Sequence, residues 1–171
     1  LGLKIPSTVV SNDPEEIRHA YDAFGGRMIG KPVRSGYVEQ GGVPQAIFTS
    51  LIHAEDLEDD AALRTAPAIY QELIPKRCDL RVTIVGRQLF GAEIDSQADP
   101  AARIDWRRTA DASLTHRAVE LPETLRRQLL SLMDCLGLVF GAIDLVRTPD
   151  DEFVFLEVNP AGQWLWLEDP L

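Results

Sequence analysis

The chain has 171 residues, of which 17 are basic and 27 acidic, so its formal net charge is −10. This length fits one ordinary domain or two small lobes, and such a chain buries roughly 70% of its unfolded surface without a disulfide or a metal. The acidic balance argues against non-specific binding to nucleic acid or to an anionic membrane. No apolar run approaches the roughly 20 residues that span a bilayer, and no signal peptide opens the chain.

The cysteines and the chain ends give two further expectations. Cys78 and Cys135 lie far apart, in strand-like and helix-like sequence. We therefore expect buried, reduced thiols in a cytoplasmic protein, with a single disulfide as the alternative. Because the chain opens at Leu1 and stops at Leu171, we also expect a fragment of something longer.

The first part of the chain predicts a small mixed lobe. Asn12-Asp13-Pro14 supplies a helix cap and a first-turn proline, and Gly25-Gly26 supplies a stop, which together predict one helix. The acidic run Glu55–Asp60 is typical of a solvated helix face. Strands are expected around these segments at 7–10, 28–33 and 45–52, with a polar loop at 34–42.

After Pro67 the pattern changes to successive strands, which predicts a larger antiparallel lobe. A hairpin is expected at Gly86-Arg87, and a helix is predicted from Pro122 to Gly137 by leucines at helical spacing. The remaining expectations are strands at 69–74, 79–85, 88–95, 138–147 and 152–159, and a long functional loop at 97–115. The fold class is therefore α+β, with a small lobe at 1–66 and a large lobe at 67–171.

One phosphate-binding motif is rejected. Residues 25–31 have the glycine and lysine spacing of a P-loop, but Pro32 follows where that loop needs Ser or Thr. The predicted order, helix before strand, is also the reverse of a P-loop. Lys31 remains a lysine within a strand, either facing solvent or functional.

The strongest signal is a pair of carboxylates on the last predicted hairpin. Side chains alternate along a strand, so one face is expected to carry Phe153, Phe155, Glu157 and Asn159. If the turn is centred between residues 150 and 151, Asp144 lies directly opposite Glu157, with Cβ atoms about 4.5–5.5 Å apart. Two carboxylates so close among apolar neighbours repel each other and require a counter-charge.

A hard divalent cation is the simplest counter-charge, and Asn159 adds a neutral oxygen ligand. Magnesium commonly takes one or two carboxylates and completes its shell with water and phosphate oxygens. The alternatives are a shifted register or a paired arginine, with the acids on a solvated face. His19, His53 and His116 are scattered, so neither a zinc site nor a Ser-His-Asp arrangement is indicated.

At these residues the chain resembles ATP-grasp ligases. Gly141–Arg147 and Phe155–Pro160 are similar to the metal-binding end of that fold. The resemblance implies an ATP-grasp fold whose two lobes enclose a nucleotide cleft. It also implies that Asp144, Glu157 and Asn159 hold magnesium, expected as two ions with manganese as an alternative, against the phosphates of ATP.

Other segments resemble the nucleotide site of the same family. Tyr70–Ile74 is similar to the hinge, which implies that the backbone reads adenine and an acid lies near the nucleotide; the residues implied are Gln71, Glu72, Leu73 and Ile74. Asp79-Leu80-Arg81 is similar to the next strand, where the acid helps to bind nucleotide and the arginine faces the phosphates. Lys31-Pro32 resembles the lysine that reaches the α- and β-phosphates.

The resemblance is closer to one branch, the ligases that cyclise ribosomally made peptides, such as microviridin (graspetide) ligases. The segments that carry it are Ala92–Ser96, Asp105–Arg107 and Gly162–Glu168. Members of this branch have an N-terminal pre-grasp domain that contributes another nucleotide-facing lysine and part of the peptide site. We expect this chain to be a fragment that lacks that domain and the full helix after Glu168, and therefore to be inactive or nearly so.

The resemblance implies a carboxylate–amine or carboxylate–hydroxyl ligase that activates a precursor peptide through an acyl phosphate. Lys31, Arg81 and Arg107 would supply positive charge, although Arg107 could lie in a surface loop. The expected partners are the precursor peptide, the missing domain and a second copy in a homodimer. Alternatives are a glutamate- or amino-acid-adding ligase, an inert nucleotide-binding module, and an α+β interaction domain.

Three pairs of side chains receive weaker predictions. Trp164 and Trp166 are expected to pack in the core or between the lobes rather than stack on substrate. Lys76 and Arg77 are interpreted as solvated turn residues, with an anion site as the alternative. Glu93 and Asp95 share a strand face that meets ATP only if the hairpin register allows it; this pair is left open.

Overall fold

The protein is described by a computed structural model that covers residues 1–34, 37–40, 42–109 and 114–165. The chain forms two compact units, which are described separately. The N-terminal unit is Pro6–Leu73, and the C-terminal unit combines Leu1–Ile5 with Ile74–Leu171. The boundary therefore follows Leu73, later than the predicted division after residue 66.

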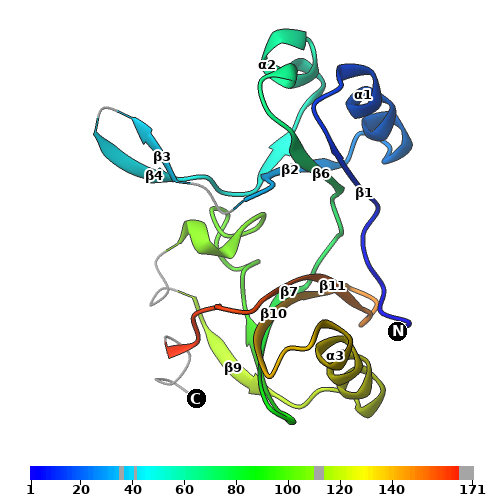
Figure 1. Cartoon of the computed structure of the whole chain (residues 1–171), viewed down its shortest axis with the longest axis vertical. Coiled ribbons are helices and arrows are strands. Elements are labelled where there is room, and N and C mark those ends of the chain that lie inside the picture. Colours follow the sequence, from blue (N-terminus) through cyan, green and yellow to red (C-terminus); the bar gives the residue numbers. More distant parts are fainter. Residues whose placement is uncertain (35–36, 41, 110–113, 166–171) are drawn as a thin grey trace. The chain divides into compact units, whose positions relative to one another are not determined.

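A four-stranded antiparallel sheet with strand order β1-β6-β2-β5 forms the N-terminal unit (Figure 1). Its strands are β1 (Thr8–Ser11), β2 (Met28–Pro32), β5 (Ser50–Ile52) and β6 (Ala68–Glu72). Its helical segments are α1 (Pro14–Ala23), η1 (Ala54–Leu57) and α2 (Asp60–Arg64). Because β6 pairs with both β1 and β2, it belongs to this unit, which explains the later boundary.

Local signals account for α1. The Asp13 side chain accepts a hydrogen bond from the Glu15 amide, and Pro14 occupies the first turn, as predicted. Ile17 and Ala20 of this helix are buried against the sheet. The predicted polar loop at 34–42 is wrong: β3 (Tyr37–Gln40) and β4 (Val43–Ala46) pair there as a separate hairpin.

The C-terminal unit is a five-stranded antiparallel sheet with strand order β11-β10-β7-β8-β9. The strands are β7 (Cys78–Val85), β8 (Gln88–Ile94), β9 (His116–Val119), β10 (Phe140–Arg147) and β11 (Phe153–Asn159). Helix α3 (Glu123–Leu136) covers one face (Figure 1) and ends at Gly137, whose φ of +66° suits a left-handed cap. The core between helix and sheet includes Leu129, Met133 and Ile143.

The last hairpin contains a bulge that changes which side chains share a face. Asp144 lies opposite Glu157 as predicted, but Leu145 lies opposite Phe155, so Leu156 is an extra residue on β11. Phe155 therefore packs with the α3 core, whereas Glu157 lies on the other face. The prediction that Phe153 and Phe155 share a face with Glu157 and Asn159 is wrong for this reason.

Three other features complete the C-terminal unit. The predicted loop at 97–115 contains the short helix η2 (Trp106–Arg108), and β9 begins directly after it. Both cysteines are free thiols; Cys78 is buried as expected, but Cys135 is exposed. Within the described ranges, no helix is long and apolar enough to cross a membrane.

Candidate active site

The candidate site lies on the face of the five-stranded sheet away from α3, here called the site face. Antiparallel pairing places Arg81 of β7 opposite Asp144 of β10, and Asp144 opposite Glu157 of β11. Directly paired residues project from the same face, so three strands bring these charged groups into one row. The α3 face of the same strands carries the apolar residues Leu80, Ile143 and Leu145.

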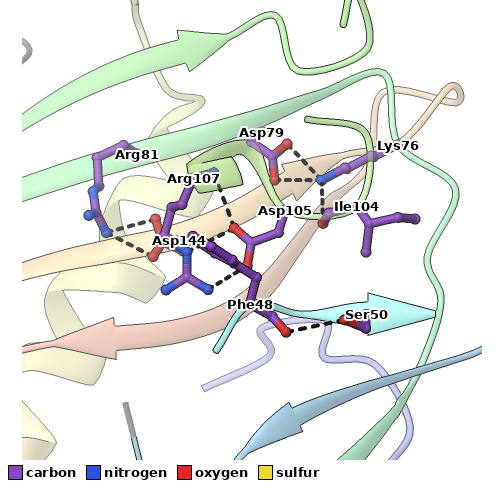
Figure 2. A network of polar contacts seen from close by, with 9 residues as sticks. All are labelled: Phe48, Ser50, Lys76, Asp79, Arg81, Ile104, Asp105, Arg107 and Asp144. Carbon is purple, nitrogen blue, oxygen red and sulfur yellow. Dashed lines mark hydrogen bonds and ion pairs between the residues drawn. The ribbon is translucent and has the colours of Figure 1, made fainter. Parts of the chain in front are cut away.

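Arg81 neutralises Asp144 directly. Its Nη1 donates to Oδ1 and to Oδ2 of Asp144, both at 2.8 Å (Figure 2), and its guanidinium lies 5.8 Å from the ring centroid of Trp106. Burial nevertheless raises the pKa of Asp144 to about 7, with the Glu157 charge adding to the rise and Arg81 opposing it. One arginine therefore does not fully offset the cost of burying this carboxylate.

Glu157 and Asn159 provide exposed oxygen atoms next to Asp144. The Asn159 Oδ1 accepts a hydrogen bond of 2.9 Å from the Ala161 amide, which orients the side chain at the end of β11. Gly162 then turns the chain so closely over the strand that a Cβ would overlap that of Ala142. This close approach is a physical reason for glycine at the start of the Gly162–Glu168 segment, of which residues 166–168 lie outside the described ranges.

The donor set fits magnesium rather than a soft metal. Among the described residues, no three His, Cys, Asp or Glu side chains cluster to hold a metal by themselves. Asp144, Glu157 and Asn159 offer two carboxylates and one amide oxygen instead. Magnesium usually takes few protein ligands and completes its shell with water and substrate phosphates, so this partial set suits it.

Arg107 is held near the acids by its neighbour Asp105. The Asp105 side chain accepts from the backbone amide of Arg107 at 3.2 Å, from its Nε at 2.8 Å and from its Nη2 at 2.7 Å. The hydrogen bonds that Arg107 donates to Asp105 raise the pKa of Arg107, and the charges of Glu157 and Asp144 raise it further. Asp105 and Trp106 are both buried, so this segment is not a simple surface loop.

Asp79, the predicted nucleotide-binding acid, has a lysine partner. The Lys76 Nζ lies 2.9 Å from Oδ1 of Asp79 and 2.7 Å from Oδ2, and it also donates to the Ile104 carbonyl at 3.4 Å (Figure 2). Burial raises the pKa of Asp79, while Lys76 opposes the rise. Interpretation of Lys76 as a solvated turn residue is wrong, because its side chain is 9% exposed.

The other predicted nucleotide residues lie in or next to the N-terminal unit. Lys31 is half-buried in β2, opposite Ile69. Gln71 is buried, and its Nε2 donates to the Thr8 hydroxyl at 2.9 Å. The amides of Glu72 and Leu73 donate to the carbonyls of Ser7 and Arg27, both at 2.9 Å, and Ile74 begins the C-terminal unit. Nucleotide contacts of these residues remain predictions.

Glu93 lies on the α3 face of the sheet rather than on the site face. It pairs with Leu80 across the strands and forms ion pairs with Arg117 and Arg147. A pocket of about 400 Å³ opens there, lined by Arg77, Cys78, Glu93, Asp95, Thr115 and Arg117. The open question about Glu93 is thus answered by the register: its face is opposite that of Arg81.

Two predictions about single residues also have outcomes. Trp164 is 39% exposed, so it does not pack in a core; packing of Trp164 between the lobes stays a prediction, and Trp166 lies outside the described residues. Arg77 is partly exposed and pairs with Asp151 at 2.7 Å. Sequence reasoning missed the contributions of Asp105 and Arg117; the N-cap spacing of Asp105 before Trp106-Arg107 was the available signal.

Comparison with solved structures places the fold. One similar structure is an ATP-grasp ligase associated with ribosomally synthesised peptides from Chryseobacterium gregarium, bound to ADP and to a leader and core peptide. It is 34% identical to this chain with a TM-score of 0.89, and the match covers 97% of this chain and 50% of that one. The macrocyclase MdnC of Microcystis aeruginosa, bound to precursor peptide MdnA, is 37% identical with a TM-score of 0.83, over 98% of this chain and 50% of that one.

A third similar structure is the ATP-grasp ligase PsnB with a phosphomimetic minimal precursor, Mg and ADP, at 25% identity and a TM-score of 0.73, over 96% of this chain and 47% of that one. No family model and no curated protein matches the chain. The chain spans about half the length of the solved structures that it matches. The predicted resemblance is confirmed: over nearly its whole length the chain is similar to ATP-grasp ligases associated with ribosomally synthesised peptides.

Proposed function

We propose that the protein is an ATP-dependent ligase that activates side-chain carboxylates of a ribosomally made precursor peptide and forms ester or amide crosslinks. The observation that carries the proposal is the row of Arg81, Asp144 and Glu157 on the site face. It occurs in a chain similar over 97% of its length to a ligase bound to ADP and a leader and core peptide.

In the proposed reaction, a peptide carboxylate attacks the γ-phosphorus of ATP, and ADP leaves. A hydroxyl or amine then attacks the acyl carbon, and phosphate leaves. Such transfers depend on positioning and charge neutralisation, so they need no histidine base. Arg81 and Arg107 supply permanent positive charge, and Asp105 holds the Arg107 guanidinium in one orientation.

Magnesium, proposed as two ions with manganese as a substitute, would offset the phosphate charge when bound. Asp144, Glu157 and Asn159 are the residues that would hold it. Their oxygens come from adjoining strands, so the sheet itself sets their spacing. Asp79 would act in nucleotide binding through its ion pair with Lys76.

The N-terminal unit would supply the remaining nucleotide contacts. Lys31 is proposed to reach the α- and β-phosphates, and Gln71–Ile74 to contact the base. Because the Glu72 and Leu73 amides already donate to backbone carbonyls, adenine would be read by carbonyl oxygens or by the Ile74 amide. The Glu72 carboxylate would lie near the nucleotide.

The whole protein is proposed to include more than this chain contributes. A pre-grasp domain would complete the peptide site, and a second copy would form a homodimer; the half-length match to the solved structures supports the first of these. A cytoplasmic location is proposed because ATP is available there and both cysteines are free thiols.

Mass spectrometry of a precursor peptide incubated with the protein, ATP and magnesium tests the proposal. We expect the peptide to lose one water for each crosslink, with one ADP formed per event. Asp144→Asn is the matched control and should abolish both signals. A mass gain of one amino acid would show an amino-acid ligase instead, and nucleotide binding without any peptide-dependent ADP would show an inert module.

A further inference from the structure

Arg81 stands out among the cations of the site face because its partner is itself a metal ligand in the proposed function. One nitrogen, Nη1, donates to both oxygens of Asp144 at 2.8 Å. A magnesium ion bound to Asp144 would therefore lie close to a guanidinium, and like charges at such short range repel each other. The two cations compete for the same carboxylate.

The other cations of this face are committed to carboxylates outside the metal set. Arg107 donates three hydrogen bonds to Asp105, through its backbone amide, Nε and Nη2. Lys76 lies within 2.9 Å of both Asp79 oxygens. Neither has to leave its partner when a metal binds, so Arg81 is the cation that metal binding displaces.

The surroundings of Arg81 allow it to change partners. Its Nε is buried and has no hydrogen-bond partner among the described residues, and its guanidinium lies over the Trp106 ring. An aromatic face attracts a cation without fixing its hydrogen bonds, so the group can turn while it remains stacked. Asp79, two residues away on the same face, is occupied by Lys76 and does not compete for Arg81.

We propose, on the basis of the function above, that Arg81 exchanges partners. It neutralises Asp144 while no metal is bound, and it turns to the nucleotide phosphates when magnesium takes its place on Asp144. Metal and nucleotide binding are therefore coupled: each is favoured by the other, because the metal frees Arg81 and the phosphates accept it. Arg81 then has two roles: it neutralises Asp144 until the metal binds, and it is a phosphate ligand afterwards.

The test measures ADP affinity by calorimetry in the presence of EDTA, in the whole protein at mildly alkaline pH. Asp144→Asn frees Arg81, so we expect ADP to bind about tenfold more tightly without metal, a coupling of ordinary size. Glu157→Gln is the matched control: it removes an acid that Arg81 does not contact, and its gain should be about twofold or less.

The double variant separates exchange from simple loss of negative charge. If Arg81 carries the gain, Arg81→Gln with Asp144→Asn binds metal-free ADP no more tightly than Arg81→Gln alone. Arg81→Lys with Asp144→Asn keeps the positive charge and replaces the glutamine variant if that variant does not fold. It should show a partial gain in metal-free ADP affinity. Circular dichroism checks that each variant is folded.

Three outcomes would overturn the exchange: no gain in Asp144→Asn, an equal gain in Glu157→Gln, or a gain that persists without Arg81. If the unaltered protein binds ADP with magnesium but the variants show one of these outcomes, only the exchange is wrong. If it binds no ADP even with magnesium, the proposed function is wrong as well.

Discussion

The two faces of the five-stranded sheet both hold a buried carboxylate paired with arginine, but their charges balance differently. On the α3 face, Glu93 forms ion pairs with Arg117 and Arg147. Asp151 at the hairpin turn pairs with Arg147 and Arg77, so each of these two acids has two arginine partners. On the site face, Asp144 and Glu157 lie opposite each other, and Asp144 has Arg81 as its ion-pair partner. The first arrangement is electrostatically satisfied, whereas the second is short of positive charge.

The difference shows that a buried ion pair does not by itself mark a functional site. Each carboxylate has an arginine within ion-pair distance, yet a second acid directly opposite appears on one face alone. A deficit of positive charge is what a metal cation could fill. Substitutions on the two faces should therefore affect different quantities.

Removing Asp144 should have the largest effect. In Asp144→Ala, magnesium loses a carboxylate ligand, so we expect magnesium-dependent ADP binding to weaken at least about 100-fold, or roughly 2.7 kcal/mol. Calorimetry with and without magnesium measures this. An unchanged magnesium dependence would show that the metal is held elsewhere.

Removing Glu93 should affect stability instead. Glu93→Gln leaves Arg147 and Arg117 with less compensation, so we expect the free energy of unfolding to fall by about 1–3 kcal/mol. Arg117→Gln, at an exposed position, should lower the free energy of unfolding by less than Glu93→Gln does, because solvent screens the Arg117 charge. Urea unfolding measures both, and magnesium-dependent ADP binding should stay within about twofold; a larger loss would make the α3 face part of the site.

Acidification should affect the site face through Asp144. Its pKa is raised from 3.8 to about 7, so the folded protein holds a proton that the unfolded chain releases over this range. The metal-free protein should therefore lose stability as pH rises from 3.8 to about 7. Thermal unfolding in EDTA should show this slope, and Asp144→Asn should reduce it.

The same proton should compete with the metal. Below the pKa of about 7, magnesium must displace the Asp144 proton, so its affinity should fall about tenfold per pH unit. Manganese titration monitored by electron paramagnetic resonance measures the change. A pH-independent affinity would mean that Asp144 is ionised throughout.

The Asp105 clamp should have a smaller effect. In Asp105→Ala, Arg107 keeps its charge but loses its fixed orientation, so we expect ATP turnover with peptide to fall about tenfold, or roughly 1.4 kcal/mol in the barrier. Asp105→Asn retains one acceptor oxygen, so its ATP turnover should lie between that of the unaltered protein and that of Asp105→Ala. Equal loss in Arg107→Ala and in the double variant would confirm that Asp105 acts through Arg107; additive losses would contradict it.

The smallest change is expected at an ion pair away from both groups of charges. Arg87 and Asp134 pair at 2.8 Å, but both side chains are exposed. Arg87→Gln should alter the free energy of unfolding by less than about 0.5 kcal/mol and leave ADP binding unchanged. A measurable effect on binding would show that variants perturb the sheet non-specifically.

Local signals predicted much of the fold. The Asp13 cap with Pro14, the leucines of α3, and the hairpin at Gly86 all depend on residues close in sequence. The hairpin β3–β4 and strand β9 were missed because their pairing depends on partners rather than on a strong local pattern. The later boundary between units has the same cause, since β6 is assigned by its neighbours β1 and β2.

The candidate site was predicted in part. Asp144 lies opposite Glu157 as expected. Nearer the turn, however, Leu145 lies opposite Phe155, which is one residue away from the predicted register. The bulge at Leu156 shifts the register by one residue and so brings Asp144 opposite Glu157. Sequence spacing cannot reveal a bulge, because an extra residue changes neither composition nor the apolar pattern enough to be detected. A paired arginine was among the alternatives, but the sequence did not identify it as Arg81, because that pair depends on the register of β7 and β10, which are distant in sequence.

The sequence by itself determined which groups could form the site: oxygen donors at Asp144, Glu157 and Asn159, and cations at Arg81 and Arg107, in a chain of net charge −10. Tertiary structure alone decided which of these charges meet. It placed Arg81 on Asp144, Lys76 on Asp79 and Glu93 on the opposite face. The reason is that side-chain chemistry is a property of each residue, whereas charge balance depends on the register of strands distant in sequence.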